Sequence, residues 1–213
     1  MNKNEQIVAA LMERKYARVA ELAKGDRRVL TKLMGMALSK EDLLAWRAIE
    51  AMGVCAQTLS RLHPERMRNL AQRILWSARE ESGGMGWSAP ELLAEIVSAS
   101  PQRFADIPPI IVSLHKEDEE KVFLKGVLWA IARMAEAGIR DVPGAEKVVL
   151  DALDDPDAQV RGLAARAAAT AGIDSACGKL AKLSADESLF VIYRNGELEK
   201  ESVGESARRA SCH

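Results

Sequence analysis

Hydrophobic residues recur three and four positions apart along most of the chain, which is the spacing of one face of an α-helix. Few stretches show the strict alternation of a half-buried strand. The pattern therefore predicts an all-α fold over most of the length. The predicted helices are residues 4–23 with a break near Lys15, 26–38, 39–53, 64–80, 88–99, 101–114 interrupted at Pro108-Pro109, 118–137, 143–153, 155–172 and 175–183.

Several predicted helix ends carry their own signals. We expect Gly53 to end the helix that Ser39 opens, since glycine commonly terminates helices. Ser88 and Glu91 have the spacing of a capping box, and Trp87 stands where a hydrophobic staple begins.

The helix at residues 155–172 has a narrow face of small residues. Asp155 is the expected N-cap, Pro156 suits the first helical position, and Asp157 falls in the electropositive first turn. Gly172 is the expected stop. Because each alanine buries little area, we expect other helices to pack closely against the backbone of this helix.

The last residues of the chain depart from the helical pattern. Residues 189–194 are β-prone, Asn195-Gly196 is a type I′ hairpin signal, and residues 197–203 can pair back. Ser202 and Glu205 form a second capping box for a short helix at 203–210. We expect residues 1–185 to form one helical domain, and residues 186–213 to pack on it as a cap or to serve as an edge for docking a partner.

The Asp155-Pro156-Asp157 turn followed by Val160-Arg161 resembles the second helix of HEAT-like repeats, the type found in phycobiliprotein-lyase relatives. Residues 128–134 are similar to the same helix, and one equivalent slot recurs 36 to 44 residues apart, against a HEAT period of about 40–47. The resemblance implies a right-handed α-solenoid of about four or five helix pairs. The slot is occupied by Trp46, Pro90, Trp129 and Ala165.

Composition favours close helix packing, since 48% of residues are hydrophobic and only 4% aromatic. Net charge is −1, yet residues 1–80 hold 15 Lys/Arg against 9 Asp/Glu. This polarity either orients a partner and drives head-to-tail contacts or reflects solvated faces. A near-neutral chain with few aromatics argues against nucleic acid, and we expect a solvated face at the arginines near residues 61–79.

The three cysteines form no CxxC pair, and no apolar run reaches the ~18 residues of a membrane span. We therefore expect a cytoplasmic protein with reduced thiols and no membrane contact. Neither internal histidine, His63 or His115, belongs to a metal-binding pair. We expect no metal ion and no cofactor.

The candidate site is the glycine-rich stretch at residues 80–91, which matches neither the GxGxxG nor the Walker pattern. It is read as a loop that binds a peptide or small molecule, as a group of acid/base carboxylates, or as a plain flexible turn. Two tryptophans in the equivalent repeat slot are additional anchors if they do not serve core packing. The candidate binding residues are Glu80, Glu81, Ser82, Gly83, Gly84, Gly86, Trp87, Glu91, Trp46 and Trp129.

Repeat stacking creates an extended surface suited to proteins and peptides. The expected function is thus a non-catalytic protein-binding or assembly scaffold, with another protein or peptide as partner. The alternative is a lyase- or hydrolase-like accessory enzyme, or a small-molecule binder, that uses the loop at residues 80–91.

Overall fold

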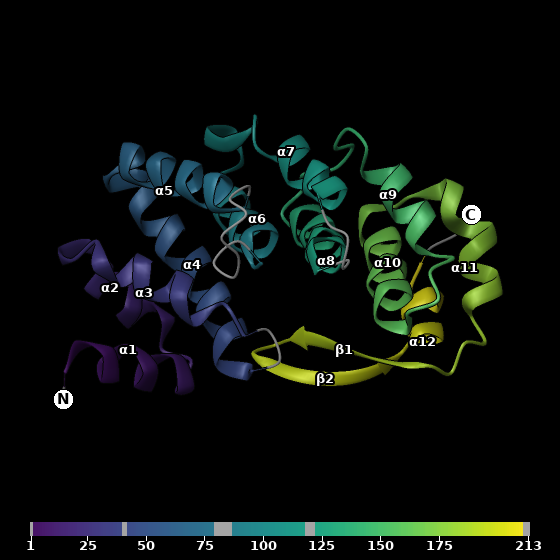
Figure 1. Ribbon diagram of the computed structural model, residues 1–213, viewed down its shortest axis with the longest axis horizontal. Helices are drawn as coiled ribbons and strands as arrows, with labels where there is room; N and C mark the ends of the chain where they lie inside the picture. The colour runs from purple at the N-terminus through teal and green to yellow at the C-terminus, as the bar shows by residue number, and fades with distance from the viewer. Residues whose placement is uncertain (1, 40–41, 79–86, 118–121, 211–213) are drawn as a thin grey trace. The chain divides into compact units, whose positions relative to one another are not determined.

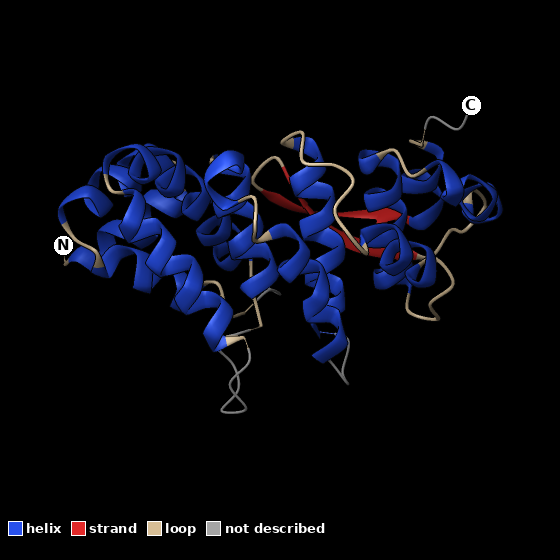
Figure 2. Ribbon diagram, turned by 90° about the horizontal axis from the view of Figure 1, so that it is seen from above, coloured by secondary structure: helices blue, strands red, loops and turns tan. Residues whose placement is uncertain are grey.

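The computed structural model describes residues 2–39, 42–78, 87–117 and 122–210 (Figure 1). These residues form twelve α-helices, three short 3-10 helices and one two-stranded antiparallel sheet near the C-terminus. The expected mainly helical chain with a small terminal hairpin is therefore confirmed, as the colouring of Figure 2 shows. The chain divides into two compact units, Met1–Ala105 and Asp106–His213.

The first unit is built around one long helix. Its central helix α4 contacts α1, α2, α3, α5 and α6. The bounds of the elements are α1 Lys3–Met12, α2 Tyr16–Gly25, α3 Arg28–Met36, α4 Leu43–Leu62, α5 Pro64–Ser77, α6 Ala89–Ala99 and the 3-10 helix η1 Pro101–Phe104.

Two local features of this unit bear on the sequence predictions. The predicted break between the first two helices is confirmed, and Arg14 adopts a positive φ of 56° there. The predicted end at Gly53 is wrong, because α4 continues to Leu62. A Cβ at Gly53 would lie 2.2 Å from a carboxylate oxygen of Glu95 on α6. This glycine therefore permits two helices to approach each other and does not terminate one.

The second unit is organised around α10. This helix contacts α8, α9, α12 and strand β1. The bounds are α7 Pro108–Ser113, η2 Leu114–Glu117, α8 Val122–Glu136, α9 Ala145–Ala152, α10 Ala158–Ala171, η3 Asp174–Ala176, α11 Cys177–Leu183, β1 Leu189–Arg194, β2 Glu197–Ser202 and α12 Val203–Arg208.

The small-residue face of α10 allows close packing, as expected. Its N-cap is Asp157 and not Asp155, because the Asp155 carboxylate instead accepts a hydrogen bond from the Asp157 backbone N–H and extends the preceding turn. Gly172 ends the helix in the left-handed conformation, as predicted. A Cβ at Gly162 would lie 2.3 Å from the Phe190 ring, so this position brings β1 directly against the helix backbone.

The predicted hairpin is confirmed. Strands β1 and β2 pair with Phe190 opposite Glu201 and Tyr193 opposite Leu198. Asn195 and Gly196 both have positive φ, as a type I′ turn requires. The capping box of Ser202 at the start of α12 is also confirmed.

Side-chain bonds fix the hairpin to α10. The Gln159 amide donates to the Val191 carbonyl at 2.8 Å and accepts from the Val191 N–H at 2.9 Å. This side chain thereby satisfies the outer backbone groups of β1 at that residue. Within the second unit, the hairpin covers one side of α10.

Cys55 is a buried free thiol, whereas Cys177 is disulfide-bonded. The expectation of reduced thiols throughout is therefore wrong at Cys177. Among the described helices, none combines the length and hydropathy needed to cross a bilayer.

Candidate functional site

Most of the glycine-rich stretch predicted as the site lies outside the described residues. This applies to Glu80, Glu81, Ser82, Gly83, Gly84 and Gly86. Trp87, which follows them, is 48% exposed. Its role as a contact for a partner stays a prediction.

Glu91 occupies a different environment from the one expected of a cap. It is only 1% exposed on α6, and Glu95 one turn later is buried as well. The Ser88 side chain makes no capping bond and donates to the Ala37 carbonyl at 2.5 Å. The predicted capping box is therefore wrong, because tertiary packing of α6 against the end of α3 takes the hydroxyl.

The two tryptophans of the equivalent repeat slot belong to different units. Trp46 is half-buried on α4 of the first unit, and Trp129 is 5% exposed on α8 of the second. Burial of Trp129 favours core packing for that residue.

The first unit contains a cleft of about 1160 Å³. Its walls are the junction of α2 with α3 and the junction of α4 with α5. Four arginines line the cleft, namely Arg27 and Arg28 from the first junction and Arg66 and Arg73 from α5. The sequence predicts Arg66 and Arg73 only on a solvated face and does not single out Arg27 and Arg28. The packing of two helix junctions brings the four arginines together.

Arg66 is the least satisfied of these arginines. Its Nε and Nη2 atoms are buried, and no acceptor among the described residues hydrogen-bonds to them. Burial lowers the pKa of Arg66, and the nearby charge of Arg27 lowers it further, while Asp26 and Cys55 act in the opposite direction. Burial also raises the pKa of the Cys55 thiol to about 12, so that this group is neutral beside the cleft.

The acids of the cleft do not balance its arginines. Asp26 already pairs with Lys3 at 2.7 Å and accepts from the Arg28 backbone N–H at 2.9 Å. Glu65 is exposed at the start of α5. Arg73 donates to the Thr31 hydroxyl at 3.0 Å, which fixes its guanidinium against α3. The cleft therefore presents a net positive surface.

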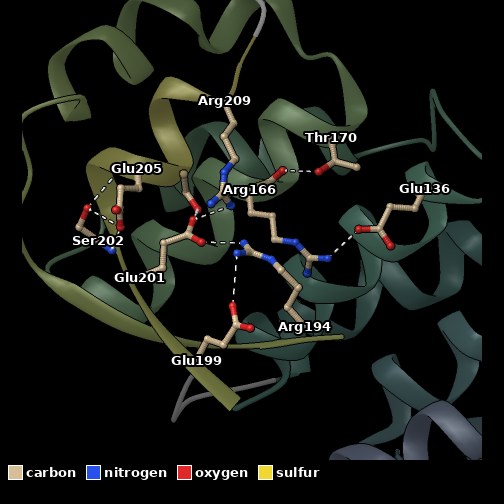
Figure 3. Close-up of polar contacts among 10 residues, drawn as sticks. Glu136, Arg166, Thr170, Arg194, Glu199, Glu201, Ser202, Glu205 and Arg209 are labelled. Atoms are coloured by element: carbon tan, nitrogen blue, oxygen red, sulfur yellow. Dashed lines mark hydrogen bonds and ion pairs between the residues drawn. The ribbon is translucent and has the colours of Figure 1, made fainter. Parts of the chain in front are cut away.

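A second group of charges lies in the second unit (Figure 3). Glu201 on β2 is 5% exposed and accepts from Arg194 at 2.6 Å, Arg209 at 2.9 Å and the Ser206 hydroxyl at 2.5 Å. Burial acts to raise the pKa of Glu201, but bonds from Ser206 and Arg194 outweigh it and lower the pKa.

The remaining members of this group are also paired. Arg166 of α10 binds Glu136 of α8 at 2.6 Å, and Arg194 lies 3.5 Å from Glu199. Burial lowers the pKa of Arg166 despite its pairing with Glu136. Three arginines thus face three glutamates, and this balance fits a role in holding the hairpin, α12, α10 and α8 together.

No cluster of three metal-ligating side chains occurs among the residues that the structure describes. His63 lines the cleft of the first unit and is exposed. The chain matches no protein-family model, no curated protein and no solved structure.

Proposed function

We propose that the chain is a non-catalytic protein-binding module, built as a right-handed solenoid of HEAT-like helix pairs, and that its arginine cleft takes an acidic segment of a partner protein. The observation that carries the proposal is the charge of the cleft lining. Four arginines, Arg27, Arg28, Arg66 and Arg73, line it together with only two acids, Asp26 and Glu65.

Carboxylates match this cleft by geometry as well as by charge. A guanidinium presents paired N–H donors that bind a carboxylate in a bidentate manner. Asp26, whose charge acts to raise the pKa of Arg66, is already paired with Lys3 at 2.7 Å. An incoming acid therefore meets little competition from the chain.

The same lining favours a peptide over a nucleic acid. Leu62 supplies exposed apolar surface in the lining, whereas Leu30 and Leu70 are almost fully buried. Among the described residues that line the cleft there is no Phe, Tyr or Trp, whereas proteins that bind single strands usually stack bases on such rings.

The alternative of an accessory enzyme depends on residues 80–86, which lie outside the described part of the chain. No observation on the described residues favours it over binding.

Fluorescence anisotropy with labelled probes tests the proposal. The probes are a Glu-rich peptide, its Gln-substituted counterpart and a single-stranded oligonucleotide. We expect the Glu-rich peptide alone to bind, and the double variant Arg27→Glu/Arg28→Glu to weaken it by about tenfold or more, equivalent to about 1.4 kcal/mol.

Arg18→Glu is a control for one such charge reversal outside the cleft, since Arg18 is exposed on α2 and does not line the cleft. An equal loss in this control would show that only overall charge matters. Absence of peptide binding at low salt, or tighter binding of the oligonucleotide, would reject the proposal.

A further inference from the structure

The most exposed of the large apolar side chains in the described residues is Trp76, at 68%. It lies on α5, which also carries two of the cleft arginines. A single exposed hydrophobic residue is common and needs no explanation. Trp76 becomes informative only through its position relative to the cleft.

Helical geometry places Trp76 beside the cleft-lining side of α5. Residues three, four and seven apart share one side of a helix. Arg73 precedes Trp76 by three positions and Asn69 by seven, and both line the cleft. At 1.5 Å per residue, Trp76 lies about 15 Å along the helix from Arg66.

The opposite end of the cleft has an apolar side chain of its own. Leu62, the last residue of α4, lines the cleft and is strongly exposed. The positive cleft is therefore bracketed by an exposed leucine and an exposed tryptophan. Tryptophan is also one of the residue types enriched among the side chains that dominate binding energy.

From this arrangement we infer that the occupant of the cleft is an amphipathic acidic segment of a partner protein, with a large apolar side chain that packs on Trp76. This inference rests on the proposed function and specifies its ligand. Carboxylates of the segment meet Arg66 and Arg73. In an extended segment, which rises about 3.3 Å per residue, the apolar residue lies about four to five positions from the carboxylate at Arg66.

Charge complementarity selects this occupant. The first unit contains 16 Lys/Arg against 12 Asp/Glu, and the cleft carries part of this excess positive charge. An uncharged apolar segment would leave the arginines unsatisfied. A uniformly acidic segment would leave Trp76 and Leu62 in water.

The test compares two labelled peptides that differ at one residue. Both are rich in Glu, and one carries Phe four positions after its central Glu where the other carries Ser. We expect the wild-type protein to bind the Phe peptide about tenfold more tightly, as removal of a contact worth about 1.4 kcal/mol implies. Trp76→Ser should abolish this preference, and Trp76→Phe should restore most of it.

Met12→Ser is the control, because Met12 is also exposed but lies on α1 and does not line the cleft. It should keep the full preference. Circular dichroism checks that each variant remains folded, as expected for changes at exposed positions.

The outcomes separate this inference from the proposed function. If neither peptide binds, the proposed function fails. If both peptides bind equally and Arg27→Glu/Arg28→Glu still weakens them, the arginine cleft stands and the role of Trp76 is overturned. If Trp76→Ser converts a self-associating protein to a monomer, in sedimentation at equal concentration, a second copy of the chain is the occupant and the inference is wrong.

Discussion

At the scale of single residues, the glycines of the helices show where close packing leaves no room for a side chain. Gly162 of α10 lies under the Phe190 ring, and Gly53 of α4 lies against Glu95. By contrast, Gly178 of α11 has nothing within 4 Å of the Cβ position. Close packing therefore requires glycine at positions 53 and 162 but not at position 178.

Gly162→Ala should destabilise the protein by about 1–3 kcal/mol, because the added methyl forces the Phe190 ring or the helix to move. The free energy of unfolding from urea denaturation measures the effect. Gly178→Ala is the control and should be neutral or stabilising by up to about 1 kcal/mol, since alanine is the better helix former. Similar values for the two variants would show that β1 does not pack as closely on α10 as the structure indicates.

At the scale of elements, the buried carboxylate of Glu201 joins three pieces of the second unit. It accepts hydrogen bonds from Arg194 of β1, from Ser206 of α12 and from Arg209, which follows α12. A two-stranded hairpin by itself is at best marginally stable in water. The packing of Phe190 and the hydrogen bonds to Glu201 therefore supply the stability that the hairpin lacks by itself.

Glu201→Gln should lower the free energy of unfolding by roughly 2 kcal/mol, because hydrogen bonds to a charged group contribute about 1.5–3 kcal/mol. Urea denaturation at neutral pH measures this loss. Glu199→Gln is the matched control, since Glu199 is more exposed and lies 3.5 Å from Arg194. Its effect should stay under about 1 kcal/mol.

The same carboxylate gives a defined pH dependence. The pKa of Glu201 is lowered in the folded protein, so the ionised group stabilises the fold above the ordinary glutamate pKa of about 4.3. This contribution is lost as the pH falls through the lowered folded pKa. Stability measured from neutral to acidic pH should therefore decline less steeply in Glu201→Gln than in the wild type. Parallel curves would show that Glu201 does not titrate with unfolding.

At the scale of the whole molecule, charge is divided between the two units. The second unit holds 14 Lys/Arg against 19 Asp/Glu, the reverse of the excess in the first. An acidic partner should therefore be attracted to the first unit and repelled by the second. This division raises the specificity of an encounter more than its final affinity.

Affinity for the Glu-rich peptide should fall as salt is raised from about 10 mM to about 150 mM, because the Debye length shrinks from about 30 Å to about 8 Å. Anisotropy titrations in NaCl measure the slope. In the Arg27→Glu/Arg28→Glu variant, affinity should depend less steeply on salt. In Arg18→Glu, the salt dependence should match that of the wild type, unless overall charge alone determines binding. An affinity independent of salt would contradict an electrostatic cleft.

The sequence by itself determined the helical class, the terminal hairpin and its turn, the break after the first helix, and the stop at Gly172, because these depend on local periodicity, capping and turn chemistry. Tertiary structure alone decided the rest. Gly53 lies inside α4, where it leaves room for Glu95 of α6, and Asp157 replaces Asp155 as the cap because the preceding turn uses Asp155. Likewise, the cleft brings together arginines that are almost forty residues apart in the sequence, and no local pattern specifies such a long-range contact.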